Sequence, residues 1–572
     1  MKNQVRQSNQ LVVAALACVF IFLIGSDATA QSITAGSTPL AVSPGAPAGS
    51  YALSDFDSVN LYNGNLGFRL PLVKVAGRGG AGYTMVMRIE KKWLVEKEPQ
   101  ELGQPNLYVP NPNWWTADGF NSIYSMGRMD VRQAGSNDYI IACSAYIHRE
   151  TLTRLTFTAP DGTEYELRDQ LTNGRPDHPT CDTGFNRGRV FVTADGSAAT
   201  FTSDTDISDY IYDNPGNFPP AGYLVLRDGT RFRIDQGLVG WMRDRNGNKV
   251  TFTYNYVQQL TSVTDSLNRQ VTITYADQST PYDQITVKGF GGAARTIKIY
   301  SGSALRSDFS VQTYQQLFPE LNGASNNPFT PGGITSVQLP NGQQYQFQYN
   351  SYNELARVVL PTGGAIEYDY AAGLTDGAAS GVLPSFLGDK HIYRRVIERR
   401  VYPDGGTGTA YATRMTYSRP ETLTSNAGYV TTDQYDSAGA LLNRSQHYFY
   451  GSPRASFNQQ PTEYGGWQDG REYQTTIFAA NGTTPLRQIT NVFEQRAPVS
   501  WWTADPALAP PNDPRLIETD TTLSDTNQVT KQTFDYDDSV PFNNQNNVKE
   551  YAFGTGAPGA DDIIKQYRSG ND

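Results

Sequence analysis

The chain has 572 residues, a formal net charge of −10, and a composition that is 38% hydrophobic, 18% charged and 12% aromatic, with 35 tyrosines and 53 glycines. Low charge with many aromatic residues argues against a disordered or long helical chain and is typical of strands joined by tight turns. No basic stripe stands out, which argues against nucleic acid as the main partner.

Residues 1–30 have the pattern of a secretory signal peptide. Lys2 and Arg6 supply positive charge, an apolar run follows, and an Ala-x-Ala cleavage site ends at Ala30. The run is short for a membrane-spanning helix, although an uncleaved anchor is the alternative. The sequence therefore predicts a secreted, periplasmic or cell-surface protein with no membrane span after cleavage. Residues 31–55 are rich in small residues and proline, and we expect a disordered linker there.

Residues 56–215 are predicted to form an N-terminal β domain. Asn63 and Gly64 mark a hairpin turn between two alternating strands. Cys143 and Cys181 remain after signal cleavage, and in an oxidising compartment they can form a disulfide that contributes about 3–4 kcal/mol. The alternative is two separate buried thiols.

A turn followed by an alternating strand recurs within residues 216–372. The copies are 244–255, 265–275, 339–350 and 360–370. Within each of two pairs of copies, 21 residues separate the tyrosines, and a fixed period of this size indicates a repeat architecture. The residues that define the repeat are Gly247, Tyr254, Asn268, Tyr275, Gly342, Tyr349, Gly363 and Tyr370.

The chemistry of the repeat explains its residues. An Asn-Gly pair suits a type I′ turn, and every second residue of the following strand faces one side. Stacked hairpins bury a continuous face, and tyrosine adds area while its hydroxyl reaches a polar group. The sequence predicts an all-β fold in which repeated antiparallel hairpins coil into a curved sheet, with the tyrosines in structural roles.

The remaining segments are less regular. Residues 313–321 are expected to form a short helix, 373–388 a linker, and 389–572 degenerate repeats. The last residues show no capping element, which is typical of a partial copy of a longer repeat array.

The four copies, together with the opening stretch Val59–Leu72, resemble the RHS/YD-repeat family. The resemblance implies a β-sheet ribbon coiled into a shell around a cavity. In polymorphic-toxin members of the family, the shell encloses a toxic domain that is released by self-cleavage at an Asp-Pro-x-Gly site. Here the Asp-Pro pairs begin at Asp505 and Asp513, and neither is followed by that glycine.

A search for catalytic motifs gives no candidate. Gly77–Gly82 satisfies G-x-G-x-x-G, but an expected strand follows it, so a flexible turn is the better interpretation. The four histidines form no zinc motif, and no serine-hydrolase or P-loop motif is present. We expect no enzyme activity, no cofactor and no metal site. Asp204, Asp206 and Asp209 indicate a solvated acidic loop, with a non-standard calcium site as the alternative.

A Trp-Trp-Thr-Ala-Asp stretch occurs twice, at Trp114–Trp115 and at Trp501–Trp502. One interpretation is an aromatic platform for a sugar or a partner, and the other is that each pair packs a loop onto a sheet.

The sequence predicts a secreted, non-enzymatic RHS/YD-type scaffold that forms a β-shell or an extracellular interaction surface. One alternative is the shell of a polymorphic-toxin delivery system, and another is a carbohydrate-binding adhesin that uses the four tryptophans. The partners expected are a cell-surface glycan or protein, or an enclosed toxin cargo, and not nucleic acid.

Overall fold

The computed structural model describes much of the second of two compact units. The chain divides into Met1–Ile33 and Thr34–Asp572, and the first unit lies wholly outside the described residues. Within the described part of the chain, no helix combines the length and apolar character needed to cross a bilayer. The described residues are 50–52, 56–75, 82–89, 93–98, 104–112, 124, 127–134, 140–142, 145–147, 149–159, 164–172, 186–193, 199–208, 210–211, 220–383, 390–422, 428–451, 468, 470–495, 514–537, 545–556 and 562–568.

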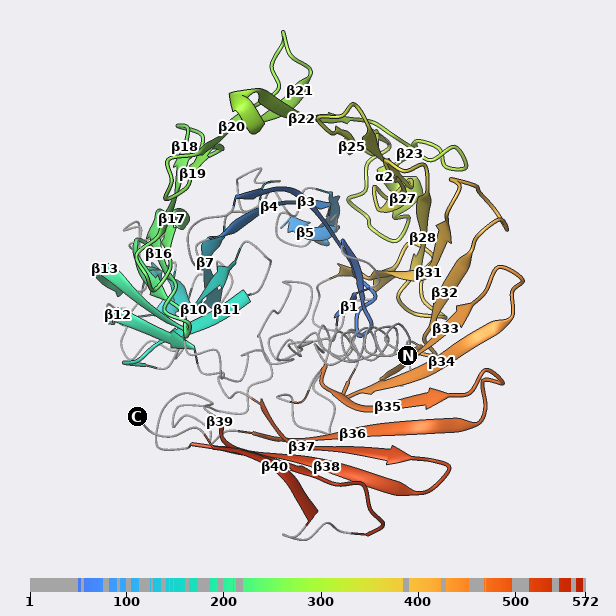
Figure 1. Cartoon of the computed structure of the whole chain (residues 1–572). Coiled ribbons are helices and arrows are strands. Elements are labelled where there is room, and N and C mark those ends of the chain that lie inside the picture. The colour runs from blue at the N-terminus through green and yellow to red at the C-terminus, as the bar shows by residue number, and fades with distance from the viewer. Residues whose placement is uncertain are drawn as a thin grey trace, which may run out of the picture. The chain divides into compact units, whose positions relative to one another are not determined.

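The predicted all-β fold is confirmed, and the paired strands run antiparallel (Figure 1). An N-terminal sheet contains β1 (Ser50–Ala52), β2 (Asp57–Asn60), β3 (Leu66–Val75) and β4 (Tyr83–Ile89). A closed ring of eight strands contains β7 (Arg128–Ala134), β10 (Arg149–Thr158), β11 (Glu164–Asp169), β12 (Asn186–Thr193), β13 (Thr200–Ser208), β15 (Gly222–Val225), β16 (Arg231–Asp235) and β17 (Leu238–Arg243).

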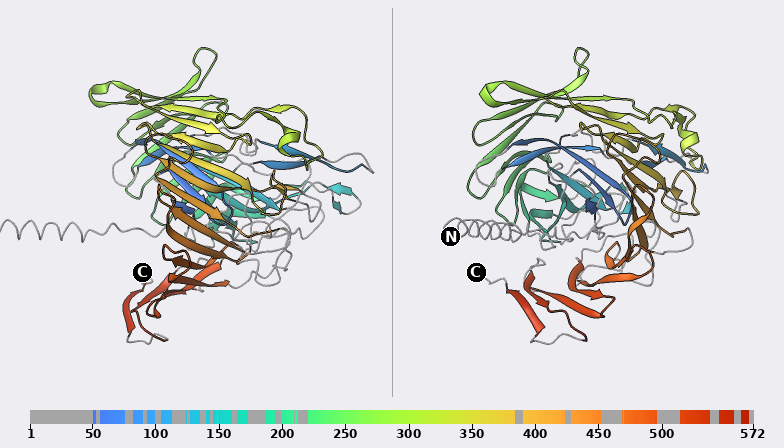
Figure 2. Two further views of the ribbon diagram at one scale, coloured as in Figure 1. Left: turned by 90° about the vertical axis from the view of Figure 1, so that its right-hand side faces the viewer. Right: turned by 45° about the vertical axis from the view of Figure 1, so that its right-hand side comes forward.

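From β17 the ring continues into a long sheet in which each strand pairs with the next, as the views in Figure 2 also show. Its strands are β18 (Lys249–Tyr254), β19 (Leu260–Thr264), β20 (Gln270–Thr274), β21 (Tyr282–Lys288), β22 (Ala294–Gly302), β25 (Gly333–Gln338), β26 (Gln344–Tyr349), β27 (Leu355–Val359), β28 (Ala365–Ala372), β31 (Arg394–Tyr402), β32 (Thr413–Ser418), β33 (Tyr429–Tyr435), β34 (Leu441–Phe449), β35 (Glu472–Phe478), β36 (Pro485–Gln495), β37 (Pro514–Leu523), β38 (Gln528–Tyr536), β39 (Gln545–Tyr551) and β40 (Ile563–Arg568).

The other described elements are short. The helix expected over 313–321 is shorter in the structure, where α2 spans Tyr314–Leu317 and the side chain of Thr313 caps its first turn. The remaining elements are β5 (Leu94–Glu98), β6 (Leu107–Asn111), β8 (Ile140–Ala142), β9 (Ala145–Ile147), β14 (Tyr210–Ile211), η2 (Phe290–Gly292), β23 (Gln312–Thr313), β24 (Pro328–Phe329), β29 (Val382–Leu383) and β30 (His391–Ile392).

In two of the four copies of the repeat, those that begin at Asp244 and Asp265, the turn closes through a carboxylate side chain at its first residue. Asp244 Oδ1 accepts hydrogen bonds from the backbone amides of Asn246 and Asn248, at 2.9 and 2.8 Å. Gly247 has φ +89°, whereas Asn246 is not among the residues with positive φ. The turn is therefore a type I turn followed by a left-handed residue, and the predicted type I′ turn is wrong.

The same turn recurs along the long sheet. Its first residue is Asn255, Asp265, Asn350 or Asp436, and in each case the side chain accepts from the amides two and four positions later. The left-handed residue follows three positions after the first and is Gln258, Asn268, Asn353 or Gly439. One local pattern of five residues thus fixes successive hairpins.

The repeat tyrosines hydrogen-bond to the strand that precedes their own. The hydroxyls of Tyr254, Tyr275, Tyr349 and Tyr370 donate to backbone carbonyls fifteen residues earlier, at 2.9, 2.9, 2.7 and 3.0 Å. Each acceptor lies next to a one-residue register shift in its strand. A bulge interrupts the ladder of backbone hydrogen bonds, and the tyrosine hydroxyl supplies a donor there.

One face of the long sheet packs against the N-terminal sheet, and we call it the covered face. The ring of Phe68 in β3 lies 5.6 Å from that of Phe347 in β26, and the ring of Tyr83 in β4 lies 5.3 Å from that of Phe252 in β18. All four belong to one buried cluster, which extends along the sheet to Phe449 in β34. Burying an apolar side chain of this size contributes about 1.5–3 kcal/mol.

Candidate functional site

Several residues singled out by the sequence lie outside the described residues. The hypotheses of an aromatic platform and of a disulfide rest on them and stay predictions. These residues are Trp114, Trp115, Trp501, Trp502, Cys143 and Cys181.

The acidic cluster is part of a strand and not the loop that was expected. Asp204 and Asp206 lie in β13 and point to arginines: Arg233 donates to Asp204 at 2.7 Å, and Arg189 donates to Asp206 at 2.8 Å. Both hydrogen bonds lower the pKa of the aspartate that accepts them. Asp209 lies outside the described residues, and no metal-binding group of histidine, cysteine or carboxylate side chains is found among the residues that are described.

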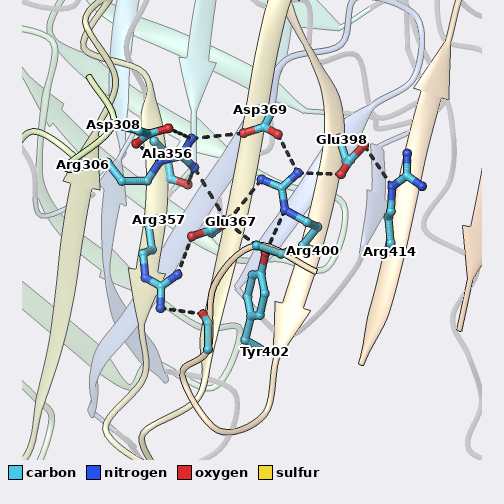
Figure 3. A network of polar contacts seen from close by, with 12 residues as sticks. Arg306, Asp308, Ala356, Arg357, Glu367, Asp369, Glu398, Arg400, Tyr402 and Arg414 are labelled. Atoms are coloured by element: carbon cyan, nitrogen blue, oxygen red, sulfur yellow. Dashed lines mark hydrogen bonds and ion pairs between the residues drawn. The ribbon is translucent and has the colours of Figure 1, made fainter. Parts of the chain in front are cut away.

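A charged network lies on the face of the long sheet opposite the covered face (Figure 3). Glu367 in β28 stands in register between Arg357 in β27 and Arg400 in β31. Arg357 donates to one of its carboxylate oxygens, and Arg400 donates to the other at 3.2 Å. The hydroxyl of Tyr402 also donates to that second oxygen, at 3.1 Å.

The network continues on both sides of this row. Arg400 donates to Asp369 at 2.6 Å and to Glu398 at 2.5 Å, and Arg414 Nε lies 3.0 Å from Glu398 Oε2. Arg306, on the segment after β22, donates to Asp369 at 3.3 Å. Burial alone would lower the pKa of Arg400, but its hydrogen bonds to Asp369 and Glu398 raise it above the usual value.

The composition of the network indicates what it does. Arg306 also pairs with Asp308, so four arginines face four carboxylates and no net charge is left to attract a ligand. Arg357 donates to the carbonyls of Gly405 and Gly406, at 2.8 and 3.0 Å, which ties a loop to the sheet. The arrangement is a cross-link between strands and loops.

A second polar contact lies on the covered face. Arg399 in β31 donates two hydrogen bonds to Asp57 in β2, at 2.7 and 3.3 Å. The exposed fractions of the two side chains are 8% and 0%. Removing one partner from a charge pair that is buried this deeply strongly destabilises a protein, because the other charge is left unpaired. The contact between Asp57 and Arg399 therefore fixes the position of the N-terminal sheet on the long sheet.

The turn at Gly64 covers two further arginines. Arg419 Nε lies 2.8 Å from Glu421 Oε2, and its guanidinium also donates to the backbone carbonyl of Tyr62. Arg395 forms no hydrogen bond with a described residue, and burial lowers its pKa to about 10. Counting described residues alone, two guanidinium groups and one carboxylate lie beneath the turn, with a net positive charge.

A third set of polar side chains is linked by hydrogen bonds in the order serine, histidine, carboxylate, as in a catalytic triad. Ser445 Oγ lies 2.9 Å from His447 Nε2, and His447 Nδ1 lies 2.6 Å from Glu472 Oε1. Thr432 Oγ1 lies 2.6 Å from Ser445 Oγ, and Thr475 donates to Glu472. The histidine is 4% exposed. A nucleophile, a base and an orienting carboxylate are thus within hydrogen-bond reach of one another.

The strand that carries Ser445 and His447 does not itself provide the backbone donors of an acyl-transfer site. Ser445 and His447 lie in β34, which pairs along its length with β33 and β35, so its backbone N–H groups are used by the sheet. An oxyanion hole needs free donors near the nucleophile. The sequence search did not find the pair because it looked for family motifs. The available signal was a serine and a histidine two positions apart in a strand, which places both on one face.

Comparison with known proteins gives similarity in structure only. No family model and no curated protein matches the chain. The crystal structure of TcdB2-TccC3 is similar at 9% identity and a TM-score of 0.12, over 87% of this chain and 27% of that one. Its form without the hypervariable C-terminal region gives 10% and 0.10, over 74% and 23%. The Tc holotoxin pore of Photorhabdus luminescens gives 9% and 0.10, over 77% and 24%. The chain spans about a quarter of the length of these structures, and the similarity is weak.

Proposed function

We propose that the protein is an exported, non-enzymatic scaffold of the RHS/YD-repeat type that presents an extracellular interaction surface. The observation that carries the proposal is the covered face. A continuous sheet of hairpins holds the N-terminal sheet of the same chain through buried rings and the Asp57–Arg399 pair. The polar side chains that repeat along the sheet stabilise turns, bulges and cross-links between strands, as expected for a structural scaffold.

The absence of catalysis is part of the proposal. In the network around Glu367, cations and carboxylates satisfy one another. The serine of the Ser445–His447–Glu472 chain lies in a fully paired strand without free backbone donors. A structural role therefore explains both sets of residues.

Export and scaffolding are tested by two measurements on the full chain. Cell fractionation with N-terminal sequencing should recover a mature protein that begins at Gln31 outside the cytoplasm. Limited proteolysis should leave β1–β4 and the long sheet in one resistant core. Full-length protein retained in the cytoplasm would contradict export, and early separate loss of β1–β4 would contradict the scaffold.

A second candidate, a shell that encloses a polypeptide cargo, is favoured by the C-terminal strands. The covered face continues into β36, β38, β39 and β40, but none of their described residues is buried. Apolar side chains such as Ile489, Phe534 and Tyr567 lie on this stretch, with Tyr567 48% exposed. Native mass spectrometry of protein purified from its own cell envelope tests this candidate. A mass equal to the mature chain alone would contradict it.

A further inference from the structure

A row of positive charges crosses three neighbouring strands where the eight-stranded ring passes into the long sheet. Arg231 in β16 pairs with Arg243 in β17, and Arg243 pairs with Lys249 in β18. Directly paired residues of antiparallel strands project from the same face, so these side chains are neighbours. The opposite face is the buried one, with Phe232 and Val250 at 3% and 0% exposure. We call Arg231, Arg243 and Lys249 the basic row.

The basic row has no counter-ion within the part of the chain that the structure describes. Among the described residues, none of its three members forms an ion pair with a carboxylate, in a chain whose net charge is −10. Like charges directly opposite one another destabilise a sheet, so the row weakens the isolated protein. Arg227 and Arg245, on the two adjacent turns, are exposed beside it. Three neighbouring cations that destabilise the fold can be neutralised by a bound anion, so the basic row indicates an anionic ligand.

Two aromatic rings lie in the next row of the same face. Tyr223, Arg233 and Trp241 stand in register across β15, β16 and β17. The centroids of the tyrosine and tryptophan rings are 6.0 Å apart, and Tyr223 is 44% exposed. Lys249 Nζ lies 5.1 Å and Arg243 Cζ 5.4 Å from the tryptophan ring centroid. Rings and cations therefore form one surface.

Two carboxylates complete this surface. Arg233 lies between Asp204 and Asp235, at 2.7 and 2.6 Å, and the two carboxylate side chains are 39% and 55% exposed. A carboxylate has about four lone-pair sites, so both keep the capacity to accept hydrogen bonds from hydroxyl groups. The surface thus offers cations for anionic groups, ring faces for stacking and acceptors for hydroxyls.

We propose that this surface binds an acidic polysaccharide. The carboxylate or sulfate groups of the glycan pair with the basic row, its rings lie against Tyr223 and Trp241, and its hydroxyls donate to Asp204 and Asp235. DNA also offers anions and rings, but its phosphates would face the two aspartates without hydroxyl donors to match them.

The binding experiment uses the purified full chain and four probes. These are polygalacturonate, heparin, neutral dextran and oligothymidylate. We expect at least one acidic glycan to bind, with affinity that falls as salt is added, and dextran not to bind. The polygalacturonate and heparin arms distinguish carboxylate from sulfate as the recognised group. No binding to either acidic glycan, or binding to oligothymidylate alone, would overturn the proposal.

Variants locate the site. Replacing the basic row by Arg231→Gln, Arg243→Gln and Lys249→Gln should weaken glycan binding at least about tenfold, since charge-assisted contacts are lost. Arg269→Gln is the matched control, because it removes an exposed cation that pairs with Asp265 elsewhere on the sheet. Lys249→Glu provides a single-site test if the triple variant misfolds. Binding by these variants as tight as wild type would show that the site lies elsewhere.

The inference deepens the proposed function by giving the interaction surface a ligand class. The two can fail separately. Retention in the cytoplasm would contradict export even if purified protein binds acidic glycans, whereas an exported scaffold that binds none would contradict only the inference.

Discussion

The hydroxyl of Tyr368 donates a 2.6 Å hydrogen bond to Asp57 Oδ2, although 311 residues separate the two in the sequence. The same oxygen accepts from Arg399 at 2.7 Å. Tyr368 and Arg399 come from neighbouring strands of the long sheet, and Asp57 comes from the N-terminal sheet. One carboxylate therefore joins the two sheets at a site from which water is excluded.

Removing that carboxylate should loosen the N-terminal sheet. Asp57→Ala leaves Arg399 buried and unpaired, which costs roughly 3–5 kcal/mol. We expect a large fall in the urea midpoint of unfolding and earlier proteolysis of β1–β4. Asp206→Ala, which breaks the exposed pair with Arg189, is the control and should change neither. An unchanged midpoint in Asp57→Ala would show that the contact does not hold the sheets together.

The tyrosine hydroxyls should contribute to stability according to their burial. Tyr349→Phe removes the donor to the carbonyl of Ile334 and leaves that buried acceptor unsatisfied, at a cost of about 1–3 kcal/mol. Tyr256→Phe serves as the control, because Tyr256 is 96% exposed. Thermal unfolding of the two variants compares them directly. Equal unfolding temperatures would contradict a structural role for the Tyr349 hydroxyl.

Alkaline pH should destabilise the fold through the same tyrosines. Burial raises the pKa of Tyr254, Tyr275 and Tyr349 above the usual 10.0. Their stabilising contribution is complete below pH 10 and is lost above it, because the unfolded chain releases protons that the folded one keeps. Each such tyrosine lowers stability by about 1.4 kcal/mol per pH unit. Absorbance titration should show these tyrosines ionising only as the protein unfolds, and early ionisation in folded protein would refute this.

The turn geometry predicts a cost for adding a side chain at Gly247. Its φ of +89° is left-handed, and a Cβ there would meet no atom within 4 Å, so the cost comes from the backbone alone. Gly247→Ala should destabilise by about 1–2 kcal/mol. Gly554→Ala is matched, since that glycine also has open space but no positive φ. Chemical denaturation of both variants would reveal whether the difference exists.

The serine of the Ser445–His447–Glu472 chain should not act as a nucleophile. Thr432 already engages its hydroxyl, and the strand offers no free backbone donor to stabilise an oxyanion. A fluorophosphonate probe followed by mass spectrometry should leave wild type and Ser445→Ala equally unlabelled. Labelling of the wild type that disappears in Ser445→Ala would establish a reactive site and contradict the non-enzymatic scaffold.

The hairpins could be predicted because their determinants are local. The side chain of a residue such as Asp244 accepts hydrogen bonds from backbone amides within four positions of it. Alternation along Lys249–Tyr254 assigns each side chain to one face of the strand. The turn type was mispredicted because Asn-Gly fits both a type I′ turn and a type I turn with a following left-handed glycine. The carbonyl acceptors of the tyrosines could not be predicted, since they depend on where bulges interrupt the neighbouring strands.

The sequence by itself determined the all-β class, the repeating hairpin and the position of its turns, because each depends on residues a few places apart. Tertiary structure alone decided that Asp57 meets Arg399 and that Arg231, Arg243 and Lys249 form one row. In the sequence these cations are scattered in an acidic chain and show no basic stripe. Strand register places them side by side, and the packing of one sheet on another selects which charges are buried together.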